Sequence, residues 1–377
     1  MKGQPIDTHI HLDHEPEINK LFKATIKADA SDLHLKLGNP PKMRVHSRLR
    51  ATSGELLTEQ KLEELIFEIL TEDQKNYFLE KGALDFAWSV GKMDRFRINI
   101  FRQRGAISMA ARHITSKIPP FETLHVPQTV EDISAKTHDG LVLVTGPTGS
   151  GKSTTIASML DYINRNRACH IVTIEDPIEF IHNDKKAIVS QREIGIDVPD
   201  FELALKSLMR QDPDVVLMGE IRDNETLTAA MRAAETGHLV FGTLHSNNAA
   251  QTIQRILDLF PQEERDLARQ TFALTFRAVV SQMLLPGIRP DAKRVPAIEI
   301  MIGNPIVKKL IQEERESDIP GAIRGGRAEG MQDFTDSLEY LVREEWIELK
   351  TAIQYAPNVE ELKMALKGVR ATSGGLL

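Results

Sequence analysis

The residues with the most specific chemistry form the uninterrupted run G-x-x-x-x-G-K-S at residues 146–153. An aliphatic, strand-like stretch precedes this run, and the helix-like stretch Thr154–Leu160 follows it. Glycines at such a turn let backbone N–H groups surround a phosphate, and the start of a helix adds positive potential. The lysine supplies a cation for β- and γ-phosphate oxygens, and the serine hydroxyl binds Mg²⁺. We therefore predict that ATP and Mg²⁺ are bound by Gly146, Pro147, Thr148, Gly149, Ser150, Gly151, Lys152, Ser153 and Thr154.

Carboxylates follow two predicted strands. The strand at 215–218 continues into Gly-Glu and reaches Glu220, and the strand at 171–174 continues into the acidic segment Glu175–Glu179. Because open α/β sheets bind ligands at the carboxyl ends of their strands, we expect these acids beside the phosphate loop. Glu220 would bind Mg²⁺ or its waters, and Glu179 would orient or deprotonate the attacking water, with Glu175 as the alternative. Without the loop, the acidic segment could equally be a solvated turn.

Two histidines flank a fourth apolar strand, Leu239–Gly242. They are His238 and His245, and a histidine at the carboxyl end of a strand can donate a hydrogen bond to a γ-phosphate. A lone histidine beside a strand is more often a half-buried loop residue, so this pattern by itself does not decide between the two. The family resemblance given below favours function, so His238 and His245 are both candidate catalytic residues at the γ-phosphate.

The elements that must position these residues form an α/β domain that begins near residue 140. Short aliphatic strands alternate there with helical stretches, which is typical of a mostly parallel sheet. After about Pro290 the pattern predicts amphipathic helices, one with an apolar stripe of Leu338, Leu341, Val342 and Trp346. The predicted strands are Leu141–Thr145, Ile171–Ile174, Val215–Met218 and Leu239–Thr243.

A smaller α+β domain precedes a proline-rich linker that contains Pro119 and Pro127. In the predicted strand Arg95–Arg102, apolar residues alternate with polar ones, which places Arg97 on the open face of a sheet. The predicted helices are Ile18–Ala28 and Glu59–Leu79, and the predicted strands are Leu33–Leu37, Met43–Val45, Asp85–Val90, Arg95–Arg102 and Ala106–Arg112.

Composition narrows the function classes. The 377 residues carry a formal net charge of -7, which disfavours a nucleic-acid motor, as does the lack of a basic, aromatic stripe. The single Cys169 excludes a disulfide scaffold and a cysteine-based zinc site, and it fits a reducing compartment. There is no apolar run of the ~18–20 residues that span a bilayer, and no signal-peptide pattern, so we expect a cytoplasmic protein without a transmembrane segment.

Longer blocks of sequence resemble the ATPases of type II secretion and type IV pili. The blocks are the phosphate loop, TIEDPIEF (173–180), GEIRDNET (219–226) and GHLVFGTLHSNNA (237–249), together with ASDLHL (30–35) and RFRINIFRQRG (95–105). The resemblance implies a PAS-like domain followed by a RecA-like P-loop ATPase domain. The expected divisions are a flexible tail at 1–16, the PAS-like domain at 17–116, a linker at 117–139, the ATPase core at 140–290, a helical region at 291–370 and a disordered tail at 371–377.

The family resemblance also implies partners. It implies a homohexameric ring at the inner face of the cytoplasmic membrane that acts on a pilus platform protein. Arg97, Arg102 and Arg112 of the first domain are the arginines expected to complete the ATP site, and the domains are expected to swing about Pro119–Pro127 on hydrolysis. The single cysteine and short N-terminal region are similar to the retraction branch, which powers twitching motility by pilus disassembly. The segment PIVKKLIQE (305–313) departs from that branch and leaves an accessory retraction paralogue as the alternative.

Other classes of protein fit the sequence less well. The segment DTHIH (7–11) resembles the metal motif of amidohydrolases, but the phosphate loop occupies the part of the chain where that barrel needs further ligands. A secretion or assembly ATPase of the same superfamily remains an alternative. A nucleotide switch without turnover is disfavoured because both Glu179 and Glu220 are present.

Overall fold

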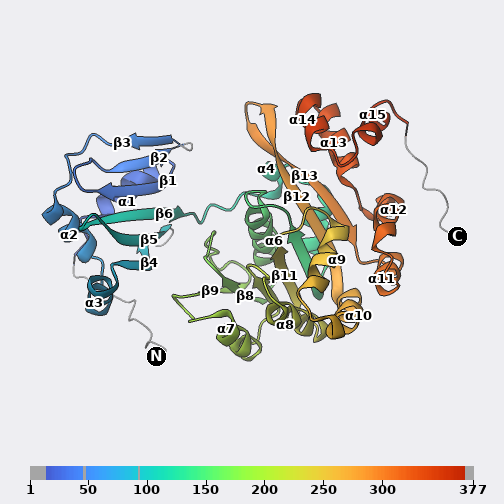
Figure 1. The fold of residues 1–377 in the computed structure, drawn as a ribbon, viewed down its shortest axis with the longest axis horizontal. Helices are drawn as coiled ribbons and strands as arrows, with labels where there is room; N and C mark the ends of the chain where they lie inside the picture. The colour runs from blue at the N-terminus through green and yellow to red at the C-terminus, as the bar shows by residue number, and fades with distance from the viewer. Residues whose placement is uncertain (1–13, 46–47, 92–93, 370–377) are drawn as a thin grey trace. The chain divides into compact units, whose positions relative to one another are not determined.

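A computed structural model describes residues 14–45, 48–91 and 94–369 of the chain (Figure 1). Residues 1–13 of the tail expected at 1–16, which include the DTHIH segment, and the tail expected at 371–377 lie outside the described residues. The chain divides into two compact units. The first comprises the residues through Lys117 with Ile178–Ile181 and Gly195–Pro199, and the second comprises the remainder.

The first unit contains a six-stranded sheet in the order β3-β2-β1-β6-β5-β4, in which neighbouring strands are antiparallel. Phe96, Ile98 and Ile100 of β5 are fully buried, and the residues between them are half-buried, as the alternation predicted. The strands are β1 Ala30–Lys36, β2 Lys42–Val45, β3 Arg48–Ala51, β4 Ala83–Val90, β5 Asp94–Gln103 and β6 Ala106–Ile114.

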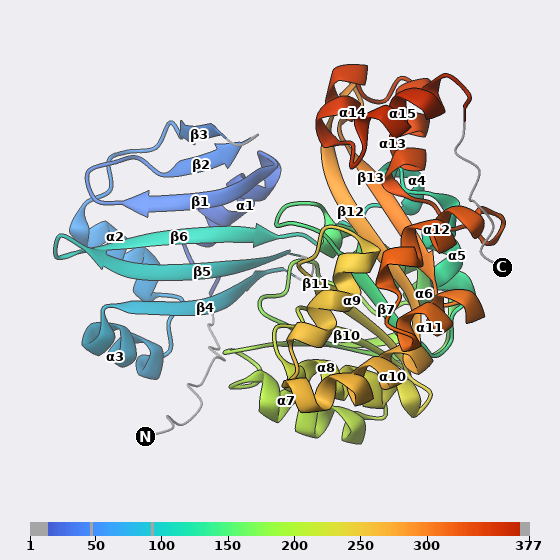
Figure 2. The same ribbon diagram turned by 45° about the vertical axis from the view of Figure 1, so that its right-hand side comes forward.

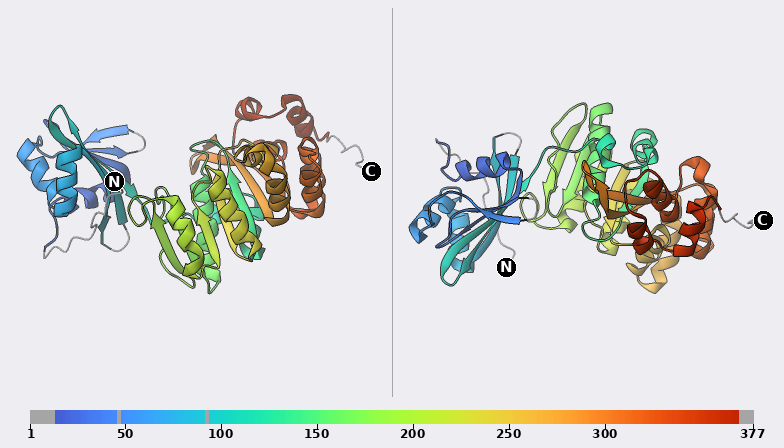
Figure 3. Two further views of the ribbon diagram at one scale, coloured as in Figure 1. Left: turned by 60° about the horizontal axis from the view of Figure 1, so that its bottom comes forward. Right: turned by 90° about the horizontal axis from the view of Figure 1, so that it is seen from above.

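Three helices complete the core of the first unit: α1 Asn19–Lys27, α2 Glu59–Phe67 and α3 Glu72–Lys81. Phe22 of α1 stacks on Phe96, with ring centroids 4.4 Å apart, and α2 and α3 lie along the sheet (Figure 3). The single helix predicted at Glu59–Leu79 is wrong, because α2 ends at Phe67 and Thr71 begins a second helix. Its side chain accepts from the backbone N–H of Gln74 in a capping box.

The second unit is built on a seven-stranded sheet in the order β13-β12-β7-β11-β10-β8-β9. All neighbouring strands are parallel except the β12–β13 pair. The four predicted strands are confirmed within a residue at each end. The strands are β7 Gly140–Thr145, β8 His170–Glu175, β9 Ile188–Glu193, β10 Val215–Met218, β11 Leu239–Leu244, β12 Phe276–Arg289 and β13 Ala292–Ile302.

Both faces of this sheet are covered, since every residue of β7, β10 and β11 is buried. On one face, Val142 and Phe241 share a core with Val130 of α5 and Met159 of α6. On the other face, Leu143 lies beside Ile221, which precedes α8. The helices of this unit are α4 Phe121–Leu124, α5 Gln128–Lys136, α6 Lys152–Asn166, α7 Phe201–Leu208, α8 Asn224–Glu235, α9 Ala249–Asp258, α10 Arg265–Thr275, α11 Pro305–Gln312, α12 Ile319–Gly325, α13 Phe334–Arg343, α14 Leu349–Tyr355 and α15 Val359–Leu366.

The prediction that the chain turns helical after about Pro290 is wrong only in its start, because residues 292–302 form β13 and the helices α11–α15 begin at Pro305. β12 and β13 form a long hairpin, and α13–α15 lie near its turn (Figure 2). The guanidinium of Arg289 stacks on Trp346 at 3.6 Å from the ring centroid. The predicted stripe is confirmed in part: Leu338 and Leu341 are buried in a core with Leu285 and Val295 of the hairpin, and Val342 and Trp346 pack against it.

The proline-rich segment after Lys117 is attached to the phosphate-loop helix. The hydroxyl of Ser158 in α6 donates to the carbonyl of Pro119 at 2.7 Å, and Phe121 packs beside Tyr162 with ring centroids 6.0 Å apart. Val130 and Ile133 of α5 are buried in the same core as α6. The segment Pro119–Pro127, expected to be the pivot, thus packs within the second unit, and its role as a pivot stays a prediction.

Within the described residues, no helix is both long and apolar enough to cross a membrane.

Candidate functional site

The phosphate loop connects β7 to α6, as the motif predicts. Gly151 has φ +90 and precedes α6, and Gly146 has φ +147 directly after β7. Both conformations are rare for residues with a Cβ atom, so glycine is required at each position. The amine of Lys152 donates to the carbonyls of Gly146 and Pro147 at 2.9 and 3.1 Å. The lysine is therefore held over the loop, where it can meet phosphate oxygens.

Gln282, which the sequence did not indicate as a site residue, hydrogen-bonds to the phosphate loop and to the helix that follows it. The amide of Gln282 in β12 donates to the carbonyl of Ser150 at 2.6 Å and accepts from the hydroxyl of Thr155 at 2.8 Å. A glutamine in an apolar strand carries no local signal of this role. Only the pairing of β12 with β7, whose residues lie more than a hundred positions earlier in the chain, reveals it.

Four parallel strands end at the edge that carries the loop. Thr145 at the end of β7 is level with Leu244 of β11, Gly242 of β11 is level with Met218 of β10, and Met218 is level with Ile174 of β8. Residues that follow these strands are therefore neighbours although they are far apart in sequence. Glu175, Glu220 and His245 all lie at this edge, as predicted.

Glu220 and His245 contact each other directly. The Nε2 atom of His245 lies 3.2 Å from a carboxylate oxygen of Glu220, and the guanidinium of Arg222 donates to the other oxygen at 2.6 Å. The hydrogen bond from Arg222 is the main cause that lowers the pKa of Glu220, and it outweighs the opposing effect of partial burial. Glu220 is therefore a carboxylate at neutral pH.

Glu175 is more enclosed than Glu220. Its side chain is buried, and one carboxylate oxygen accepts from the hydroxyl of Thr173 at 2.6 Å and from the amide of Gln191 at 3.1 Å. Glu179, the favoured base, lies in the segment Ile178–Ile181, which packs with the first unit. Its role stays a prediction.

The prediction that His238 contacts the γ-phosphate is wrong, because His238 lies at the amino end of β11. Its carbonyl accepts from the N–H of Gly140 at the start of β7, and its ring contacts the carbonyl of Ala233 at 3.0 Å. The six residues of β11 separate it from His245, which amounts to about 20 Å of extended chain. The rule that ligands bind at carboxyl ends of strands could have excluded it from the sequence.

The three candidate arginines of the first unit do not share one face of their sheet. Arg97 of β5 lies directly opposite Arg112 of β6, so these two are on the same open face. Arg112 donates to Asp32 at 3.0 Å. Arg102 instead lies over the ring of Phe78 in α3 at 5.5 Å, on the face that the helices cover. Arg97 and Arg112 therefore share the face opposite the helices, and their contact with phosphate stays a prediction.

The donor set suits a Mg²⁺–nucleotide complex. Mg²⁺ prefers oxygen ligands and keeps several waters, so one or two protein ligands plus phosphate oxygens suffice. The half-buried hydroxyl of Ser153 and the ionised carboxylate of Glu220 belong to the loop and strand edge just described. Among the described residues, no cluster of three or more acidic, histidine or cysteine side chains could form a metal site without a nucleotide.

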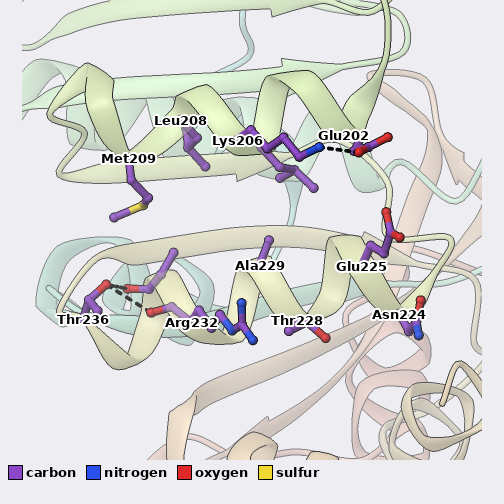
Figure 4. Close-up of a pocket in the computed structure, with 12 residues that line it drawn as sticks. Glu202, Lys206, Leu208, Met209, Asn224, Glu225, Thr228, Ala229, Arg232 and Thr236 are labelled. Atoms are coloured by element: carbon purple, nitrogen blue, oxygen red, sulfur yellow. Dashed lines mark hydrogen bonds and ion pairs between the residues drawn. The ribbon is translucent and has the colours of Figure 1, made fainter. Parts of the chain in front are cut away.

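A separate pocket lies between α7 and α8 (Figure 4). It has a volume of about 480 Å³, and Leu205, Met209, Ala229 and Arg232 contribute to its walls. None of the predicted site residues lines it, so we do not assign the phosphate chemistry to this pocket.

Comparison with known proteins shows the family of this chain. Residues 121–364 match the family described as Type II/IV secretion system protein. The chain is 43% identical to the type IV pilus retractation ATPase PilT of Pseudomonas aeruginosa, over 90% of this chain and 98% of that protein. It is 36% identical to the type IV pilus ATPase PilU of the same organism, over 93% of this chain and 91% of that protein.

A solved structure is also similar over nearly its whole length. It is the crystal structure of the pilus retraction motor PilT with bound ADP, which aligns with a TM-score of 0.83 at 41% identity over 93% of this chain and 99% of that one. The match to the family covers more than half of the chain, and the similarity to PilT extends across both units. This chain belongs to the Type II/IV secretion system protein family.

Proposed function

We propose that this chain is an ATP-hydrolysing motor that powers the retraction of type IV pili. The observation that carries the proposal is the convergence of the phosphate loop, Glu220 and His245 at one edge of the seven-stranded sheet. That edge can bind a nucleoside triphosphate and place a carboxylate beside its terminal phosphate. Similarity to PilT over almost the whole chain supports retraction as the task of the motor.

Each proposed site residue has a distinct task in hydrolysis. Lys152 and the backbone N–H groups of residues 146–154, Pro147 excepted, bind the β- and γ-phosphates, and bound Mg²⁺, held by Ser153 and Glu220, would neutralise their charge. A carboxylate, Glu179 or Glu175, orients and deprotonates the attacking water. His245 donates a hydrogen bond toward the γ-phosphate from its place beside Glu220. Arg97 and Arg112 of the first unit supply positive charge to the same phosphate.

Mechanical work would follow from the loss of these contacts. ATP holds the two units together through charge-assisted hydrogen bonds, and phosphate release removes them. We propose that six copies form a ring at the inner face of the cytoplasmic membrane, where the change displaces a pilus platform protein. Since residues from Pro119 onward are attached to α6, the pivot is expected to lie before Pro119.

An accessory retraction ATPase similar to PilU is the second candidate. The observation that favours it is α11, whose sequence departs from the retraction branch and whose Ile306 is 60% exposed while Val307 and Ile311 are buried. An exposed isoleucine on such a helix could contact a paralogous ATPase.

Deletion of the gene in the source organism tests the proposal. Loss of a retraction motor should leave cells with excess surface pili and no twitching, because assembly continues unopposed. Bald cells would contradict the proposal and indicate an assembly motor. Excess pili with twitching retained when a paralogous ATPase is present would favour the accessory role. Complementation with the unaltered gene and with the Lys152→Ala form serves as the matched control.

A further inference from the structure

Gln282 occupies an unusual position for an amide side chain. It lies on β12 and is only 3% exposed, and both ends of its amide are used by the phosphate loop and its helix. The NH₂ group donates to the carbonyl of Ser150, and the oxygen accepts from the hydroxyl of Thr155. Burial of an amide without partners is costly, so both bonds fix the orientation of this side chain.

The same residue explains why two positions of the loop are glycine. A Cβ atom on Gly146 would lie 2.3 Å from the backbone carbonyl oxygen of Gln282, and one on Gly151 would lie 2.8 Å from its amide nitrogen. Both distances are shorter than atoms tolerate. Gly146 and Gly151, which lie on either side of Ser150, are therefore both packed closely against Gln282.

The neighbouring residue strengthens this contact between β12 and the loop. The hydroxyl of Thr145, the last residue of β7, donates to the hydroxyl of Ser281 at 2.9 Å, and both residues are fully buried. The end of β7 is thus hydrogen-bonded to β12, and the loop that follows it is hydrogen-bonded to Gln282.

We propose that Gln282 is a positioning residue that holds the phosphate loop in its nucleotide-binding shape. Its amide group donates to the Ser150 carbonyl and so orients that carbonyl toward β12. The backbone N–H groups of the loop are then free to face the phosphates. Thr155 anchors the other end of the amide in the first turn of α6. The inference rests on the proposed function only in requiring that the loop binds a nucleotide.

A Gln282→Leu variant of the full chain tests this role. Leucine has a similar volume but neither hydrogen bond, so the loop loses its support in both the substrate complex and the transition state. We expect the KM for ATP and the Kd for fluorescently labelled ADP to rise at least tenfold, with kcat within about threefold of the unaltered protein. Gln332→Leu is the matched control, because it also removes one amide–carbonyl bond in this unit, 2.8 Å to Ile298 on β13. It should leave KM and Kd unchanged.

Gln282→Glu provides a second test with nearly unchanged shape. The carboxylate can still accept from Thr155 but repels the Ser150 carbonyl, so KM should rise further than in Gln282→Leu. A protonated carboxyl can donate to that carbonyl. The ratio of the variant's KM to that of the unaltered protein should therefore fall as the pH is lowered from 8 to 6, which a merely structural defect would not produce.

The contrary results are equally specific. A purely structural role would lower kcat and the unfolding temperature and leave KM unaltered in both variants, which would overturn the inference. An unaltered protein that binds no labelled ADP would overturn the proposed function together with it. A chain that binds and hydrolyses ATP for a task other than pilus retraction would leave the role of Gln282 intact.

Discussion

The imidazole of His245 lies 3.2 Å from the carboxylate of Glu220, although the two residues follow different strands of the sheet. β10 and β11 are adjacent and parallel, and the hydroxyl of Thr243 donates to the carbonyl of Gly219 at 2.6 Å, which fixes the two strand ends together. A histidine that could contact a γ-phosphate is thereby linked to a carboxylate that could hold Mg²⁺. We expect this pair to respond to whether the γ-phosphate is present.

His245→Ala should lower kcat for ATP hydrolysis by one to two orders of magnitude, because it removes a hydrogen bond that we expect to strengthen in the transition state. His238→Ala is the matched control, since His238 lies at the opposite end of the same strand, and its kcat should stay within about threefold. Steady-state phosphate release measures both. Equal losses in the two variants would contradict the site described here.

Arg222 should set the pH range in which Glu220 is active. Its hydrogen bond lowers the pKa of Glu220, so the charged form persists at pH values where an ordinary glutamate is already protonated. Activity that needs this charge is present above the lowered pKa and disappears as the pH falls through it. Arg222→Ala should therefore shift the acid limb of the kcat profile to higher pH. An acid limb at the same pH in both proteins would show that Glu220 is not the titrating group.

Arg97 and Arg102 lie on opposite faces of the sheet in the first unit, so we predict different effects on kcat when each is replaced. Arg97→Ala should reduce kcat at least tenfold, because Arg97 lies on the open face opposite Arg112. Arg102→Ala should leave kcat nearly unchanged, because Arg102 lies against Phe78 and donates to the carbonyl of Gly105 at 3.2 Å. A larger loss from Arg102→Ala than from Arg97→Ala would reverse the assignment.

Glu299 should make the second unit less stable at alkaline pH. Burial, opposed by a hydrogen bond from the N–H of Ala249, raises its pKa to about 7 from 4.5. The folded state then binds a proton that the unfolded state releases, so stability is full below pH ~4.5 and is lost as pH rises through about 7, by roughly 3 kcal/mol.

Glu299→Gln removes this dependence and keeps an oxygen that accepts from Ala249. Urea denaturation should show the variant to be more stable than the unaltered protein at pH 8 and equally stable near pH 5. A constant difference between the two proteins across this range would contradict the proton linkage.

The sequence predicted the elements whose signals are local. β7, β8, β10 and β11 are short aliphatic runs, and the phosphate loop is defined by consecutive residues, so both could be read without the fold. β12 and β13 could not be predicted from the sequence, because Pro286, Gly287 and the charged residues around them resemble a loop. The hairpin is instead stabilised by the pairing of β12 with β7. Gln282 was missed for the same reason, since its partners lie 127 and 132 positions away.

Two further outcomes show where pattern reasoning needed the fold. Arg97 and Arg102 were both candidates, although they lie five positions apart in one strand and therefore on opposite faces; the contact with Phe78 of α3 shows which face Arg102 occupies. Pro119 and Pro127 suggested a flexible linker, whereas Ser158 and the core around α6 attach that segment to the second unit.

The most direct test of the account is ATP turnover by the purified full-length chain with Mg²⁺, compared with its Lys152→Ala form. We predict steady phosphate release by the unaltered protein and a loss of at least a hundredfold in Lys152→Ala, since the amine that meets the β- and γ-phosphates is gone. Equal turnover by the two proteins would contradict a nucleotide site at this loop and, with it, the proposed motor.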